Sequence, residues 1–223
     1  MPRQQQPAAR PVRRRSYDQF CATARALDSV GDRWTLLIVR ELLAGPRRYT
    51  DLHADLPGVS TDVLASRLKD MEQSGLALRR KLPPPAAASV YELTTRGREL
   101  LPVLTALAQW GAPALDERRP TDAVRAHWFA LPLRRSLAAT AHSGVVEVHL
   151  DEGEFHVRTG PVPPGEEVYG YGPAPRADAR IVLDAELCLA MGREETGFAQ
   201  AVKDGRIEVY GESPLATELR EGR

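Results

Sequence analysis

Short polar and basic side chains gather on one face of the segment that runs from Ser60 to Ser74. Thr61, Asp62, Ser66 and Lys69 share this face, and Arg67 lies on its flank. Hydroxyl groups and cations are the side chains that contact phosphates and base edges in the grooves of nucleic acids. The same pattern is also typical of an ordinary helical hairpin with a solvated polar face. The segment therefore predicts either a nucleic-acid contact or a plain solvated surface.

The elements that hold this face are a short helix, a turn and a longer helix between residues 47 and 76. Pro57-Gly58 ends the short helix, because proline removes a backbone donor. The hydroxyl of Ser60 is placed to cap the longer helix, and Gly75 is placed to end it. The buried face of the longer helix has helical spacing and consists of Leu64, Leu68 and Met71. This arrangement predicts a helix-turn-helix.

Two short strands, residues 77–82 and 89–93, follow the longer helix, because the apolar period changes towards two. A β-hairpin directly after a helix-turn-helix favours a winged helix, although a plain solvated edge strand is the alternative. Cations at the hairpin base and before the short helix are candidates for phosphate contacts: Arg48, Arg79, Arg80 and Lys81.

Three further helices are expected at residues 16–30, 33–43 and 94–110, and Thr94 is placed to cap the last. The last is strongly apolar, and Pro102 is expected to kink it or to lie near its start. Such a helix favours a dimer contact, with packing on the domain's own first helix as the alternative. Its apolar face consists of Leu100, Leu101, Leu104, Leu107 and Trp110.

The motifs between residues 17 and 111 have a specific order and spacing. They are Cys21, Gly31-Asp32-Arg33-Trp34, Arg40-Glu41-Leu42, Gly45-Pro46-Arg47-Arg48-Tyr49, Tyr91-Glu92-Leu93-Thr94 and Trp110-Gly111. Together they resemble the HxlR-type winged helix-turn-helix regulators. The resemblance implies a homodimeric bacterial transcription regulator that binds double-stranded DNA at a palindromic operator. The proline- and alanine-rich wing tip and a second domain depart from most members.

Cys21 falls where some members of that family carry a thiol that responds to oxidants or electrophiles. A cysteine near a helix N-terminus can have a lowered pKa and therefore more thiolate. Cys21 is therefore a candidate redox sensor. The alternative is that it is a buried structural thiol.

The composition is that of a globular protein, with 223 residues, 43% hydrophobic and 27% charged. The length is compatible with one domain or two, and no apolar run is long enough to span a membrane. The first fifteen residues are rich in Arg, Gln and Pro, which does not fit a secretory signal. We therefore expect a cytoplasmic protein without a membrane partner.

The net charge of zero conceals an asymmetry between the two halves. Residues 1–119 contain 19 Lys and Arg against 13 Asp and Glu, or +6, so the remaining residues carry −6. The basic half is the half with the helix-turn-helix, which is compatible with nucleic-acid binding. Residues 1–15 are expected to be a disordered arm that either tracks phosphate or merely aids solubility.

No catalytic or metal-binding pattern is present. The two cysteines cannot make a disulfide framework, and no Cys/His cluster has zinc spacing. No nucleophile elbow, P-loop or dinucleotide fingerprint occurs. The five scattered histidines are expected at the surface: His53, His127, His142, His149 and His156. We therefore expect no enzyme, no cofactor and no metal.

The C-terminal half predicts a helix from Thr121 to about His142, broken at Pro132, followed by alternating strands and short helices. The strands are expected at 144–150, 154–158, near 168–169, 179–183 and 206–210. Helices are expected at 184–190, 195–202 and after Ser213. This order predicts an α+β domain with a mainly antiparallel sheet.

That order, with the ending Gly205–Gly211, resembles the sterol-carrier-protein-like (SCP2-like) domains. The resemblance implies an apolar tunnel for a hydrophobic small molecule. Residues that could line it are Trp128, Phe129, Phe155, Val157, Tyr169, Leu187, Met191 and Phe198. The same residues could equally fill an ordinary core.

We therefore predict an α+β protein in four parts: a disordered basic arm (1–15), a winged-helix domain (16–111), a linker (112–120) and an SCP2-like domain (121–223). The predicted function is a DNA-binding regulator acting as a repressor and a homodimer, with a hydrophobic effector in the second domain. The alternative is a lipid- or small-molecule-binding protein whose winged helix mediates protein contacts only.

Overall fold

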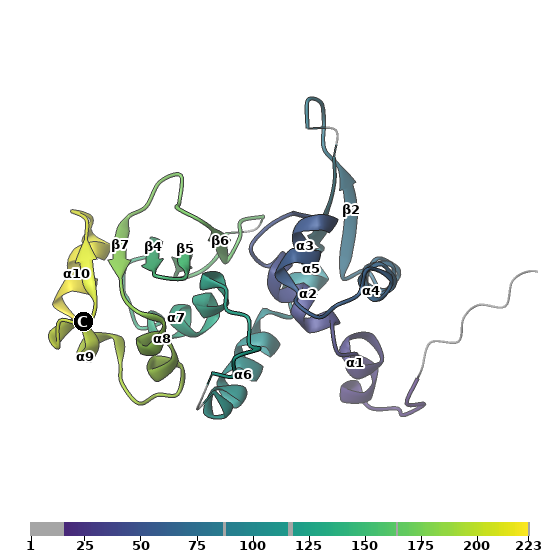
Figure 1. Cartoon of the computed structure of the whole chain (residues 1–223), viewed down its shortest axis with the longest axis horizontal. Helices are drawn as coiled ribbons and strands as arrows, with labels where there is room; N and C mark the ends of the chain where they lie inside the picture. The colour runs from purple at the N-terminus through teal and green to yellow at the C-terminus, as the bar shows by residue number, and fades with distance from the viewer. Residues whose placement is uncertain (1–15, 87, 116–117, 164, 223) are drawn as a thin grey trace, which may run out of the picture.

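The computed structural model describes residues 16–86, 88–115, 118–163 and 165–222. It contains two sheets, one with the strand order β1-β3-β2 and one with the order β6-β5-β4-β7-β8 (Figure 1). We call residues 22–114, around the first sheet, the winged-helix domain, and residues 126–222, around the second, the C-terminal domain. The predicted α+β class is confirmed. The basic arm predicted for residues 1–15 lies outside the described residues.

The helices of the winged-helix domain enclose a core that includes Ile38 and Val39, both without solvent exposure. The first helix begins at Ala22 and not at Ser16, because Asp18 has a φ of 52°, which an α-helix does not accommodate. The helices are α1 (Ala22–Val30), α2 (Thr35–Leu42), α3 (Tyr49–Asp55), α4 (Thr61–Gln73), α5 (Thr95–Arg98) and α6 (Leu101–Gly111).

The helix predicted for residues 94–110 is divided into α5 and α6. Thr94 caps α5 as predicted, since its side chain accepts a hydrogen bond from the Gly97 amide. Pro102 lies in the first turn of α6, where a helix loses nothing through its missing amide.

The helix-turn-helix and the wing form as predicted. Ser60 accepts a hydrogen bond from the Val63 amide at 3.3 Å and so caps α4. Gly75 ends α4 with a φ of 68°, a conformation that favours glycine. Strands β2 (Ala77–Lys81) and β3 (Ser89–Leu93) make the wing, and a two-residue strand, β1 (Arg47–Arg48), pairs with the far side of β3.

The C-terminal domain places its helices against one face of the five-stranded sheet (Figure 1). Three of its strand pairings are antiparallel, while β4 and β7 are parallel. The strands are β4 (Gly144–Leu150), β5 (Gly153–Thr159), β6 (Tyr169–Tyr171), β7 (Ala179–Val182) and β8 (Glu208–Tyr210). The helices are α7 (Ala130–Ser136), α8 (Ala185–Gly192), α9 (Phe198–Lys203) and α10 (Pro214–Glu221).

The start of this half differs from the sequence prediction. No continuous helix runs from Thr121 to His142: a 3₁₀ turn at Ala126–Phe129 leads into α7, which ends at Ser136. Pro132 does not break α7, because it lies in the first turn, where its missing amide has no helical partner to lose. The predicted linker begins with a further 3₁₀ turn, Ala112–Ala114, that continues α6.

The two domains share one continuous cluster of buried apolar side chains. α6 packs on α7, and α2, α3 and β1 face the C-terminal domain, whereas α4, α1 and the wing lie on the side away from it (Figure 1). Among the described residues, no helix is both long and apolar enough to cross a membrane.

Candidate nucleic-acid interface

The outer face of α4 carries the polar side chains predicted to contact nucleic acid. Thr61, Ser66 and Lys69 are exposed, whereas the opposite face of the helix is buried in the core. The hydroxyl of Tyr49, on α3, donates a hydrogen bond of 2.7 Å to the Thr61 carbonyl. This bond ties the two helices of the hairpin together and fixes the direction in which α4 begins.

Arg67 differs from its neighbours because its guanidinium is already engaged. It lies 2.8 Å from the carboxylate of Asp70, one turn later, and 3.7 Å from that of Asp32. Its side chain is 30% exposed. To reach a base edge, Arg67 must therefore exchange these carboxylates for DNA.

The three cations of the wing point to two faces of the hairpin. Arg79 and Lys81 share one face, since side chains alternate along a strand. Arg80 lies on the other face and makes hydrogen bonds of 2.8 and 3.0 Å to Glu92. The first pair is therefore better placed for phosphate contacts than Arg80.

Arg48 is exposed at the start of α3, and its amide donates to the carboxylate of Asp51 at 3.4 Å. Its neighbour Arg47 is half-buried and forms an ion pair with Asp55 at the other end of α3. Arg48 is thus free to meet a phosphate, while Arg47 holds the strand and the helix together.

Cys21 is exposed immediately before α1, so the alternative of a buried structural thiol is wrong. Interaction with the backbone amides of Ala24 and Thr23 lowers the pKa of its thiol. Cys188 is the opposite case, because burial raises its pKa to about 12. Of these two thiols, only Cys21 combines exposure with an increased thiolate fraction.

The residues predicted to line a ligand tunnel lie mostly in the packed core of the C-terminal domain. Trp128 and Phe129 are half-buried, and the others are buried: Phe155, Val157, Tyr169, Leu187, Met191 and Phe198. A small cavity lies elsewhere, where Thr105 and Gln109 of α6 meet Leu131 and Arg135 of α7. The apolar tunnel therefore stays a prediction.

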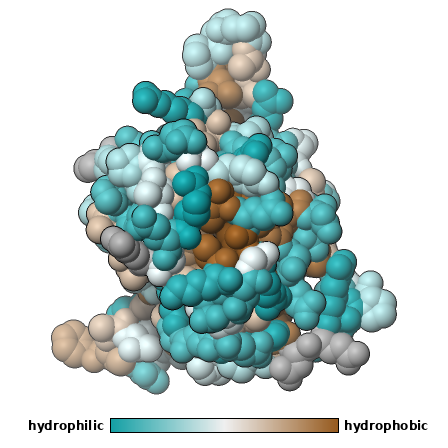
Figure 2. Space-filling view, turned by 90° about the vertical axis from the view of Figure 1, so that its left-hand side faces the viewer, coloured by the Kyte–Doolittle hydropathy of each residue, from teal (hydrophilic) through white to brown (hydrophobic). Residues whose placement is uncertain are grey.

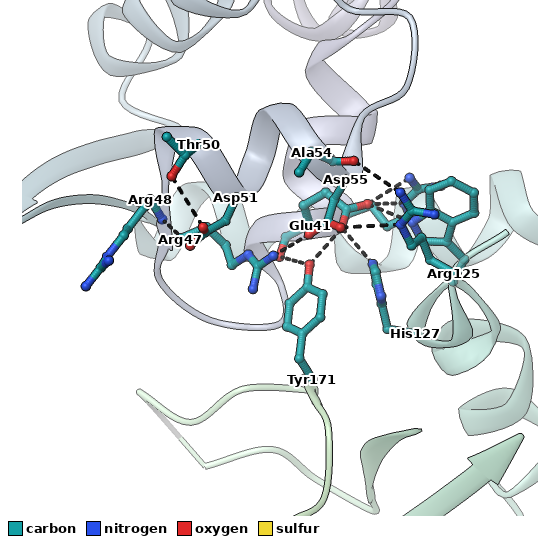
Figure 3. A network of polar contacts seen from close by, with 12 residues as sticks. Glu41, Arg47, Arg48, Thr50, Asp51, Ala54, Asp55, Arg125, His127 and Tyr171 are labelled. Atoms are coloured by element: carbon teal, nitrogen blue, oxygen red, sulfur yellow. Dashed lines mark hydrogen bonds and ion pairs between the residues drawn. The ribbon is translucent and has the colours of Figure 1, made fainter. Parts of the chain in front are cut away.

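Sequence reasoning missed a polar cluster between the two domains (Figure 3). Its centre is Glu41, a fully buried carboxylate on α2. His127 Nε2 and the hydroxyl of Tyr171 each lie 2.7 Å from Glu41 Oε2, and the indole nitrogen of Trp128 lies 3.0 Å from its other oxygen. His127 was expected at the surface and is buried, because this carboxylate satisfies its ring.

The pKa of Glu41 reports the balance of forces in this cluster. Burial raises the pKa, but the hydrogen bond from His127 and the charge of Arg40 outweigh it and lower the pKa to about 2. The sequence signal for this cluster was Glu41 itself, which lies within the apolar run of residues 34–43. A charged group buried in such a run needs a partner. Across the described residues, no three His, Cys, Asp or Glu side chains gather to hold a metal ion.

Comparisons with known proteins concern the winged-helix domain. The model of the HxlR-like helix-turn-helix family matches residues 29–119. The HTH-type transcriptional regulator YvaP of Bacillus subtilis is 36% identical over 92 residues, which cover 41% of this chain and 85% of YvaP. The HTH-type regulator sll1512 of Synechocystis is 37% identical over 98 residues, which cover 44% of this chain and 73% of that protein.

Among solved structures, the reduced form of the transcriptional regulator YodB from B. subtilis is similar, with 29% identity and a TM-score of 0.39. The alignment covers 45% of this chain and 100% of that chain.

Proposed function

Because the chain belongs to the HxlR-like helix-turn-helix family and is thus a DNA-binding transcriptional regulator, we propose that it binds a palindromic operator as a homodimer and represses transcription. The observation that supports this most is the outer face of α4, where Thr61, Ser66 and Lys69 are exposed on the side away from the C-terminal domain. Repression follows where the operator overlaps a promoter.

The DNA complex uses α4 as the recognition helix in the major groove. α4 has 13 residues, so it is about 20 Å long at 1.5 Å per residue. Thr61, Ser66 and Arg67 contact base edges or nearby phosphates, and Ser60 lies at the helix N-terminus, which attracts anions. The phosphate contacts come from Arg48, Lys69, Arg79 and Lys81, while Arg80 contributes less because it pairs with Glu92. In a two-fold dimer, the two α4 helices enter successive major grooves about 34 Å apart.

The dimer uses apolar side chains that the single chain leaves in solvent. Phe20 and Leu27 are exposed at α1, and Val103, Leu107 and Trp110 are exposed on α6. Large apolar side chains left in solvent are typical of surfaces that bind another protein. These side chains are the ones that a second copy would cover.

A hydrophobic small molecule bound to the C-terminal domain is the effector in this proposal. Figure 2 supports it, because apolar side chains gather there in a hollow bordered by hydrophilic ones. An effector can act only by binding the DNA-competent and the incompetent dimers with different affinity. A native mass spectrum of the purified protein tests this directly, since a co-purified lipid adds its mass to the dimer.

The test of DNA binding is a gel shift with the region upstream of the protein's own gene at about 150 mM salt. We expect a specific complex at nanomolar protein, the usual range for an operator at this ionic strength. Absence of a complex at micromolar protein would contradict the proposal and favour a small-molecule-binding protein whose winged helix serves protein contacts.

A further inference from the structure

The interface between the two domains is built around a charge that neither domain satisfies alone. Within the winged-helix domain, the Glu41 carboxylate pairs with the neighbouring Arg40 at 2.7 Å. Its remaining hydrogen-bond partners belong to the C-terminal domain and are His127, Trp128 and Tyr171. These contacts join parts of the chain more than 80 residues apart, as the separation of 86 residues between Glu41 and His127 illustrates.

A second group of contacts extends from Tyr171 through β1 to the last turn of α3. The guanidinium of Arg47, on β1, lies 3.8 Å from the centre of the Tyr171 ring and pairs with Asp55 at the end of α3. Arg125 lies 3.5 Å from the same Asp55 and donates a hydrogen bond of 3.3 Å to the Ala54 carbonyl. The last turn of α3 thus receives a cation and a donor from outside its own domain, which suits the negative end of a helix.

The last turn of α2 is held in the same way. The Tyr169 hydroxyl donates to the Arg40 carbonyl. The Arg40 guanidinium lies 4.3 Å from the centre of the Trp128 ring. These side chains connect the C-terminal domain to the segment that runs from α2 through β1 to α3, and therefore to the first helix of the helix-turn-helix.

Buried charges of this kind fix geometry more strictly than apolar contacts do. A displaced apolar face can slide and repack, whereas a displaced partner would leave the Glu41 carboxylate buried without its donors, which is costly. These contacts therefore favour the register in which Glu41 keeps all of these donors. Arg48, which we assign to a phosphate, is the direct neighbour of Arg47 in this register.

We propose that this group of residues, which we call the Glu41 cluster (Glu41, Arg47, Asp55, Arg125, His127 and Tyr171), lets the C-terminal domain set the position of β1 and α3 and thereby the affinity of α4 for DNA. Tyr171 and Arg125 act as positioning residues from outside the helix-turn-helix. The inference rests on the proposed DNA binding. Through this cluster, a change in the C-terminal domain would alter the position of α3 and hence DNA affinity.

The experiment compares Tyr171→Phe and Arg125→Ala with a matched control. Tyr171→Phe keeps the ring beside Arg47 and removes only the hydroxyl that donates to Glu41. Glu218→Gln is the control, because Glu218 makes a comparable contact of 2.8 Å with His142 inside the C-terminal domain. Circular dichroism first establishes a temperature at which all the proteins are folded, and operator affinity is then measured there.

We expect each of the two variants to weaken operator binding about tenfold, within the usual range for coupling between sites, while Glu218→Gln binds like the wild type. Hydrogen exchange without DNA should show faster exchange of the α3 amides in the two variants and unchanged exchange of α3 in Glu218→Gln.

Wild-type affinity and wild-type exchange of α3 in both variants would overturn the proposal. A similar loss of affinity in Glu218→Gln would also overturn it, because the effect would then be general destabilisation. If the wild type itself binds no DNA, the proposed function fails, but the exchange of the α3 amides still decides whether the Glu41 cluster positions that helix.

Discussion

At the scale of single residues, the carboxylate of Glu41 should make stability depend on acid pH. Its folded-state pKa of about 2 lies below the usual value of 4.5. A depressed pKa contributes stability above the unfolded value, and this contribution is lost as the pH falls from about 4.5 to about 2. At 1.36 kcal/mol per pKa unit, the contribution at neutral pH is about 3 kcal/mol.

We therefore expect urea unfolding at pH 7 to show Glu41→Gln less stable than the wild type by about 3 kcal/mol. The difference between the two proteins should shrink steadily as the pH falls below about 4.5. A difference that is the same at pH 7 and pH 3 would mean that the carboxylate charge contributes nothing.

Arg67 tests whether the recognition helix reads bases. Its contacts with Asp70 and Asp32 are partly exposed ion pairs, which are individually weak, so a DNA group can replace them. Arg67→Ala should weaken operator binding by about 1–3 kcal/mol and non-specific binding by less. Equal losses on operator and random DNA would instead assign Arg67 to a phosphate, and unchanged binding would leave it a structural role on α4.

Cys21 is expected to respond to oxidants because it is exposed and its thiol pKa is lowered by the first-turn amides of α1. Peroxide oxidises a thiolate to a sulfenic acid, and it should release the operator from the wild type but not from Cys21→Ser. Cys188→Ser is the matched control and should respond like the wild type, because Cys188 is buried. Release of the operator from Cys21→Ser as well would exclude the sensor.

At the scale of elements, the wing should contribute charge to DNA binding from one face only. Replacing both Arg79 and Lys81 with Ala should reduce the slope of log affinity against log salt by about two, because each phosphate contact contributes about one. Arg80→Ala should change the slope by less than one, since Glu92 already neutralises Arg80. An unchanged slope in the double variant would remove the wing from the interface.

Elements whose stabilising contacts lie within a few residues along the chain could be predicted from the sequence. The caps at Ser60 and Thr94 use side chains three residues from their amides, and the wing strands follow a local change of period. Strand β1 was missed because two residues form a strand only through their partner, β3. The helix predicted from Thr121 was wrong because apolar spacing does not distinguish a 3₁₀ turn from an α-helix.

At the scale of the whole molecule, contacts between distant segments escaped sequence reasoning. The parallel pairing of β4 with β7 and the burial of His127 against Glu41 both require knowledge of which segments meet. Composition alone cannot separate a histidine in solvent from one that a distant carboxylate satisfies. The polar face of α4 was predicted because its residues lie within one helix.

At the scale of the whole molecule, a palindromic operator requires two copies of α4 and therefore the proposed homodimer. Trp110, near the end of α6, is 83% exposed, so the single chain leaves a large aromatic side chain in water. Trp110→Asp places a charge on the face that a second copy would cover, and burial of an unpaired charge is costly. Analytical ultracentrifugation should therefore show a dimer for the wild type and a monomer for this variant.

The same variant should lose operator affinity without a change in its recognition helix. Two linked modules bind about 10²–10⁴-fold more tightly than one, so Trp110→Asp should weaken binding to the palindrome by about 100-fold or more and leave binding to a half-site unchanged. Tyr210→Asp is the matched control, because Tyr210 is a 42% exposed aromatic residue on β8, in the C-terminal domain. If Trp110→Asp remains a dimer, or if Tyr210→Asp dissociates equally, the interface does not lie on α6, and the spacing of the two α4 helices must be set by another surface.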